Sequence, residues 1–175
     1  SSVGGTYTAS QLALENGLAV NLAGGYHHAF ADHEEGFCFF NDVAIAIKKL
    51  RAEGELEKAM IVDLDIHHGN GNASIFEESV EVEIFDAYFT DSSYYPKKKF
   101  PVDYKVRLVP GETGTSYLEK LERLETALDT FQPEIVFYLA GADPYEGDIL
   151  GGQYAGLKLS KEDMRTRDQY LIDTV

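Results

Sequence analysis

Apolar residues in this 175-residue chain follow strand-like and helix-like patterns in alternation. Continuous apolar runs without polar alternation are typical of strands buried on both faces. Such runs cover residues 18–22, 59–65 and 135–140, and weaker strand patterns cover 80–87 and 104–109. Apolar residues at helical spacing predict helices over 6–15, 43–50, 115–131 and 160–175. Strands that alternate with helices indicate an α/β fold with a mostly parallel sheet flanked by helices.

Local signals mark several helix ends. Gly17 is a stop for the first predicted helix, and Gly54 closes the second. Asn41 is the expected N-cap of the second helix, and Ser160 opens a capping box at the last one. Pro133 breaks the pattern that ends at residue 131.

Polar residues follow three of the predicted strands. Residues 21–28 follow the first apolar run, residues 63–67 end the second, and Asp143 follows the third. In parallel sheets, ligands lie beyond the carboxyl ends of the strands. We therefore expect these residues to converge on one crevice.

The strongest chemical signal is the segment that contains Asp63, Asp65 and His67. In an extended segment, alternate residues share a face, so these three side chains point the same way. Two carboxylates and an imidazole on one face repel and desolvate one another, and this arrangement is unfavourable unless a cation lies among them. Asp143 adds a third ligand to Asp65 and His67, and three ligands with open positions are typical of a catalytic metal. Oxygen and nitrogen ligands suit Zn²⁺, and also Fe²⁺, cobalt or manganese. A polar loop that caps the next helix is the alternative.

A catalytic metal needs a base, and the pair His27 and His28 is the natural candidate. Gly24 and Gly25, just before it, allow close backbone approach or form a plain turn. His33 lies alone among acidic residues, and we expect it on the surface.

Composition narrows the function classes. The chain has 44% hydrophobic residues, which is ordinary for one globular domain. Thirty acidic and fifteen basic residues leave a net charge of −15, which argues against nucleic-acid and anionic-membrane partners and is compatible with a cationic one. Cys38 is the single cysteine, so no internal disulfide forms, and a cytoplasmic or nuclear compartment is the simpler expectation. No apolar run reaches the roughly 18–20 residues of a membrane span.

Four blocks of sequence, taken in order, carry a resemblance to a known family. They are residues 21–29, 36–42, 63–71 and 140–143. Together they resemble the histone deacetylase superfamily, most closely its class IV branch and bacterial relatives. The resemblance implies an arginase/deacetylase-like fold and the zinc-dependent removal of acyl groups from lysine side chains or related amines.

The resemblance also implies roles for single residues. Asp65, His67 and Asp143 match the metal ligands, and His27 and His28 match the tandem histidines that transfer protons.

Further matches concern the partners of the histidines and the substrate channel. Asp63 matches the carboxylate that orients His27. Asn70 stands where many members pair an Asp with the second histidine, which favours a less basic His28 as the base. Gly36 and Phe37 match residues that line the acyl-lysine channel, although Phe37 also lies in an apolar run typical of core packing. A monovalent cation, K⁺ or Na⁺, is implied near Asp63 and Asp65.

The resemblance covers the central part of the family's domain. We therefore expect residues 1–175 to be a partial deacetylase-like catalytic domain, truncated at both ends and lacking the family's oxyanion tyrosine. Expected partners are acylated lysine peptides or acylated polyamines. A non-catalytic module that binds acyl peptides is an alternative. An arginase-type ureohydrolase is less favoured, because Gly69 and Tyr145 stand where a second metal requires carboxylates.

Overall fold

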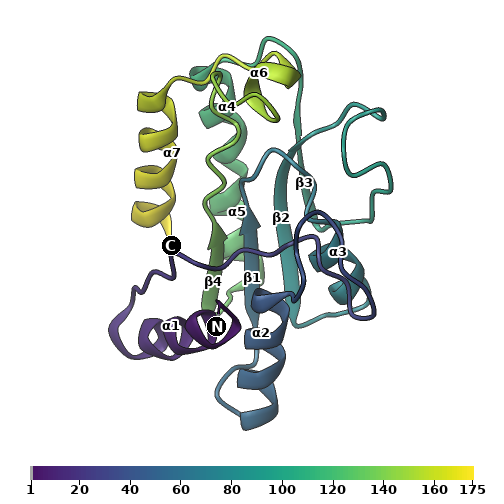
Figure 1. Cartoon of the computed structure of the whole chain (residues 1–175). Helices are drawn as coiled ribbons and strands as arrows, with labels where there is room; N and C mark the ends of the chain where they lie inside the picture. The colour runs from purple at the N-terminus through teal and green to yellow at the C-terminus, as the bar shows by residue number, and fades with distance from the viewer. Residues whose placement is uncertain (1) are drawn as a thin grey trace.

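A computed structural model describes residues 2–175 and contains one four-stranded parallel sheet (Figure 1). The strand order is β3-β2-β1-β4, and the strands are β1 (Ala59–Asp63), β2 (Val82–Phe89), β3 (Tyr104–Leu108) and β4 (Ile135–Leu139). The helices are α1 (Ser2–Asn16), α2 (Asp42–Glu53), α3 (Asn70–Phe76), α4 (Gly114–Leu121), α5 (Arg123–Phe131), α6 (Gly152–Ala155) and α7 (Lys161–Thr174). The predicted α/β fold with a parallel sheet is confirmed.

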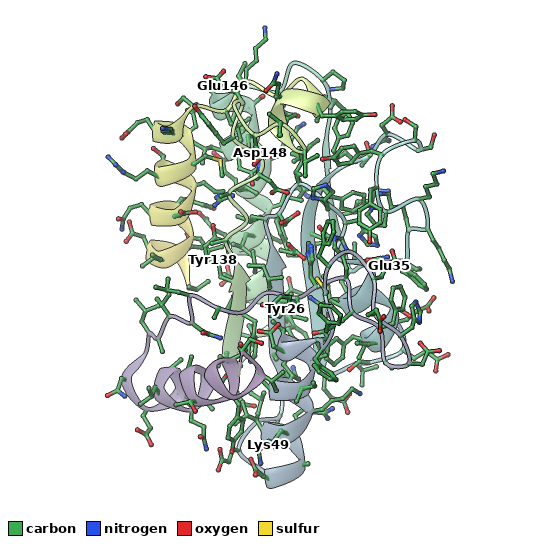
Figure 2. The ribbon with its side chains drawn as sticks, in the orientation of Figure 1. Tyr26, Glu35, Lys49, Tyr138, Glu146 and Asp148 are labelled. Carbon is green, nitrogen blue, oxygen red and sulfur yellow. The ribbon has the colours of Figure 1, made fainter. Side chains whose placement is uncertain are left out.

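Helices cover both faces of the sheet. Met60 and Val62 of β1 pack with the apolar residues of α4, α5 and α7, whereas Ala59 and Ile61 pack with those of α2 and α3. Every residue of β1 is buried, because this strand has a neighbour on each side and helices above and below. The Tyr138 hydroxyl of β4 (labelled in Figure 2) also donates to the Asp168 carboxylate of α7, at 2.6 Å.

The sheet register brings carboxylates to one edge. Asp63, the last residue of β1, lies opposite Asp86 of β2 and Leu139 of β4. The carboxyl ends of β1 and β4 therefore lie at the same level, beside Asp86 of β2, and the predicted site residues follow these two ends.

The structure confirms most of the predicted helix ends. Asn41 accepts a hydrogen bond from the Ala44 amide at the start of α2, and Gly54 ends that helix with a positive φ of 75°. Ser160 forms the predicted capping box of α7. The helix predicted over 115–131 is divided into α4 and α5 at Glu122, and the sequence did not predict the short helices α3 and α6.

The strand predicted over residues 18–22 is wrong. This segment has no regular secondary structure and pairs with no described strand, and the side chains of Leu18, Val20 and Leu22 are 61%, 73% and 97% exposed. A groove of about 1090 Å³ is lined by this segment, β4 and the end of α7. A segment becomes a strand only when its backbone forms hydrogen bonds with the edge of a neighbouring strand. Residues 18–22 do not pair with the outer edge of β4, and no other described segment pairs with that edge.

Candidate metal and acid–base site

Three side chains from two strand ends meet at the carboxyl edge of the sheet. His67 Nδ1 lies 3.0 Å from Asp65 Oδ1 and 2.8 Å from Asp143 Oδ2. One ligand atom of each residue lies within 4.8 Å of the others, and all three side chains are partly buried. The structure therefore brings together the three predicted metal ligands.

The donor set suits a cation. Burial opposes a charge on His67, yet the carboxylates of Asp143 and Asp65 raise its pKa to about 9. The two carboxylates thus favour positive charge at the position between them. A divalent ion held by two carboxylates and an imidazole fits the residues present.

A buried arginine holds the two strand ends together. Arg167 of α7 is 1% exposed, and its Nη1 donates to the carbonyl oxygens of Leu64 (3.2 Å) and Gly141 (2.8 Å). These carbonyls lie one residue after β1 and two residues after β4, so Arg167 joins the two loops that carry the three candidate ligands. No local pattern predicts this role for Arg167, because an arginine in a helical segment is expected to lie in solvent.

His27 is held by a carboxylate. Its Nδ1 lies 2.6 Å from Asp63 Oδ2, and its Nε2 lies 3.9 Å from Asp65 Oδ1. Burial disfavours the imidazolium, but Asp63 and then Asp65 outweigh it and raise the pKa of His27 to about 10. His27 therefore carries a proton on each ring nitrogen at neutral pH.

His28 is held by an amide instead. Its Nδ1 lies 2.7 Å from Asn70 Oδ1, and its ring centroid lies 4.0 Å from that of His27. Burial and the nearby charge of His27 lower the pKa of His28 to about 3. The two adjacent rings thus differ in charge at neutral pH.

The second histidine pair is divided between the site and the core. His67 faces the candidate metal position, whereas His68 is fully buried with its Nδ1 2.7 Å from Asp86 Oδ2. His68 Nε2 accepts a hydrogen bond from the Phe100 amide at 3.0 Å, so its Nδ1 is the donor to Asp86. Asp86 was not among the predicted site residues, although its position near the end of a predicted strand was an available signal.

A tight turn lies against His28. Glu35 and Cys38 exchange backbone hydrogen bonds, and Gly36 and Phe37 between them have positive φ values of 55° and 63°. A Cβ on Gly36 would lie 2.4 Å from His28 Cδ2, so only glycine fits there. Phe37 is 95% exposed, so the alternative of core packing for this residue is wrong.

Two residues that the sequence analysis passed over complete the surroundings of His28. Tyr95 packs edge-on against its ring at 5.0 Å between centroids. Glu35 accepts hydrogen bonds from Asn70 Nδ2 (2.8 Å) and from the Tyr95 hydroxyl (2.9 Å). The loop that carries Glu35 crosses in front of α3 in Figure 2. No local signal separates Glu35 from its neighbour Glu34.

Comparison with known proteins identifies the family. The model of the histone deacetylase domain matches residues 1–175. The chain belongs to the histone deacetylase family. Histone deacetylase 2 of Arabidopsis thaliana is 40% identical over 172 residues, which cover 95% of this chain and 43% of the relative. An uncharacterized protein of Picosynechococcus sp. is 38% identical over 174 residues, which cover 99% of this chain and 56% of the relative.

A solved structure of the family agrees with the fold. The crystal structure of the HDA15 HD domain superposes with a TM-score of 0.80 at 25% identity, covering 99% of this chain and 52% of that one. The chain therefore spans about half the length of the relatives it matches. Within residues 2–175, no helix is both long and apolar enough to cross a bilayer.

Proposed function

We propose that this chain carries the metal and acid–base centre of a deacetylase that removes acyl groups from lysine side chains or related amines. The convergence of Asp65, His67 and Asp143 beside one protonated and one neutral histidine carries the proposal. Asp65, His67 and Asp143 would hold the metal, and Zn²⁺ suits this ligand set, with Fe²⁺ as the alternative.

The proton-transfer roles follow from the surroundings of the two histidines. Asp65, His67 and Asp143 would hold a metal ion that, when bound, would polarise an acyl carbonyl and acidify water. His28 is neutral, so its Nε2 is free to accept the proton of the attacking water. His27 is held charged by Asp63, so its Nε2–H stabilises negative charge on the reacting carbonyl and supplies a proton toward the leaving amine.

The proposed substrate class rests on the exposed side chain of Phe37 and on the net charge of the chain. Phe37 projects from a turn beside His28 and offers an apolar face to a linear acyl-lysine or acyl-polyamine chain. The net charge of −15 favours a substrate with further positive charges. We therefore propose acylated lysine peptides or acylated polyamines as the partners.

A buried carboxylate oxygen supports the proposed monovalent cation, K⁺ or Na⁺. Asp86 Oδ1 is buried without a hydrogen-bond partner among the described residues. Asp86 lies opposite Asp63 in the sheet register, and burial raises its pKa to about 8. A cation beside Asp86 and Asp63 would satisfy this oxygen.

A single-metal site fits better than the two-metal site of a ureohydrolase. A Cβ on Gly69 would lie 2.5 Å from Asp63 Oδ2, so no carboxylate fits at that position. Among the described residues, one three-ligand group is present.

Metal content tests the proposal most directly. After dialysis, the purified protein is expected to hold one zinc or iron ion per chain, measured by elemental analysis. Asp143→Asn and Asp143→Ala lose that ion, whereas Asp129→Ala, an exposed aspartate on α5, keeps it. A wild-type protein without metal contradicts the proposal, and two ions per chain favour the ureohydrolase.

Turnover separates an enzyme from a binding module. The metal-loaded protein is expected to release free acid from a panel of acetyl-lysine peptides, long-chain acyl-lysine peptides and acetylpolyamines. His28→Gln is expected to reduce turnover by about 10²–10⁴-fold, as expected for loss of a general base. Binding of acyl peptides without turnover of any of them would instead show a non-catalytic module.

A further inference from the structure

Asn70 differs from a carboxylate in one respect that bears on His28. Its amide has two chemically different ends, and either could face the ring of His28. If the NH₂ group faced His28 Nδ1, that nitrogen would have to accept, and the proton of the neutral ring would move to Nε2. The orientation of Asn70 therefore decides which nitrogen of His28 is free.

Glu35 removes this ambiguity. Its carboxylate only accepts hydrogen bonds, and Glu35 Oε1 lies 2.8 Å from the side-chain nitrogen of Asn70. Asn70 must therefore present its NH₂ group to Glu35 and its carbonyl oxygen to His28, at 2.7 Å. His28 Nδ1 is then the donor, and Nε2 is left without a proton.

The surroundings hold Glu35 in this position. Its Oε1 also accepts from the Tyr95 hydroxyl at 2.9 Å, and its Oε2 lies 3.9 Å from His33 Nε2. The turn from Glu35 to Cys38 is closed by two backbone hydrogen bonds. Asn70 itself is 1% exposed, so water does not compete for its amide.

We infer that Glu35 is a positioning residue for the proposed deacetylation, which fixes the orientation of Asn70 and thereby keeps Nε2 of His28 free to accept a proton. This inference rests on the proposed role of His28. Glu35 acts through Asn70, and its side-chain partners among the described residues are Asn70, Tyr95 and His33.

The first test is the tautomer of His28 in the purified protein, read from ¹⁵N chemical shifts of labelled histidine. The wild type is expected to carry its proton on Nδ1, and Glu35→Ala is expected to populate the form protonated on Nε2. Glu34→Ala is the matched control, because it removes the same charge one residue away on an exposed side chain. Tyr95→Phe is expected to leave the tautomer unchanged, since it keeps the bond between Glu35 and Asn70.

Kinetics give a second readout. Glu35→Ala is expected to lower kcat about 10-fold, in the range found for partners of functional histidines, with a smaller change in KM. A tautomer and a kcat that are both unchanged in Glu35→Ala overturn the inference.

Exchanging the amide and the carboxylate between positions 70 and 35 separates this role from a merely structural one. In Asn70→Asp, the 2.8 Å hydrogen bond from Asn70 to Glu35 is lost, and the carboxylates at positions 70 and 35 repel each other. Activity is therefore expected to fall. Adding Glu35→Gln to Asn70→Asp then supplies an NH₂ donor to the introduced carboxylate and is expected to restore activity. Glu35→Gln alone is expected to lower activity, because the Gln amide no longer dictates the orientation of Asn70.

The sign of the Glu35→Gln effect is therefore expected to reverse between the wild-type and Asn70→Asp backgrounds. An equal loss in both backgrounds overturns the inference, because it means that Glu35 only supports the fold or the position of Tyr95. The tautomer measurement needs no turnover. A protein that deacetylates nothing thus contradicts the proposed function alone, whereas an unaltered tautomer in an active Glu35→Ala contradicts the positioning role alone.

Discussion

His27 and His28 are adjacent in the chain and their ring centroids lie 4.0 Å apart, yet their surroundings favour a protonated His27 and a neutral His28. The buried carboxylate of Asp63 accepts from His27, whereas the neutral amide of Asn70 accepts from His28. Burial alone disfavours charge on both rings, so the partner decides the outcome. In the proposed reaction, the hydrogen-bond partners Asp63 and Asn70 thus make one of two identical side chains a proton donor and the other a proton acceptor.

The largest expected effect comes from deleting each partner in turn. Asp63→Ala leaves a charged, buried His27 without its carboxylate and is expected to lower the free energy of unfolding by about 3–5 kcal/mol. Asn70→Ala leaves one neutral donor unpaired and is expected to cost about 1–3 kcal/mol. Urea unfolding of both variants measures the difference, and equal losses would mean that His27 is not charged in the folded protein.

Gly36→Ala tests how closely the turn approaches His28. A left-handed φ costs an L-residue about 1–2 kcal/mol, and the contact of 2.4 Å with His28 Cδ2 adds about 1–3 kcal/mol of overpacking. Gly17→Ala is the matched control, because Gly17 has a positive φ of 88° and no atom within 4 Å of the added methyl group. Thermal or urea unfolding should show the larger loss for Gly36→Ala. Similar losses for the two variants would mean that the turn moves away from His28 without cost.

The two histidines also predict opposite pH dependences of stability in chelator-treated protein. The folded pKa of His28, about 3, lies below its ordinary value of 6.5, so its contribution is present above pH 6.5 and is lost as the pH falls toward 3. The folded pKa of His27, about 10, lies above 6.5, so its contribution is present below pH 6.5 and is lost as the pH rises toward 10.

Unfolding free energies measured from pH 4 to pH 10 check these signs. His28→Gln should flatten the acid limb and leave the alkaline limb, and His27→Gln should do the reverse. If either variant flattens both limbs, the two rings titrate as one unit and the assignment of charge to His27 alone is wrong.

Phe37→Gly is expected to have the smallest effect on stability. The glycine relieves a left-handed φ, worth about 1–2 kcal/mol, and costs about 0.5–1 kcal/mol in the flexibility of the unfolded chain. The side chain is 95% exposed, so little packing is lost. The free energy of unfolding should therefore change by no more than about 1 kcal/mol, while KM for an acyl-lysine peptide rises. A large loss of stability would show that Phe37 packs in solution.

Much of the fold and of the candidate site was predictable from local patterns. The apolar runs predicted β1, which is buried along its whole length between two neighbouring strands, and β4, an edge strand that buries alternate residues. Asp65, His67 and Asp143 directly follow these strands, and a parallel sheet brings its carboxyl ends to one edge. Strand pattern and topology together therefore placed the three candidate ligands without any contact information.

The tertiary structure decided what depends on partners distant in the chain. The run of residues 18–22 is as apolar as a buried strand but lies exposed, because strand formation requires a neighbouring edge and not only an extended segment. The sequence placed Asn70 beside His28 only through a resemblance, and it gave no reason to distinguish Glu35 from Glu34. Only folding brings Glu35 to 2.8 Å from an amide 35 residues away, and this contact leaves one orientation of Asn70 and one free nitrogen on His28.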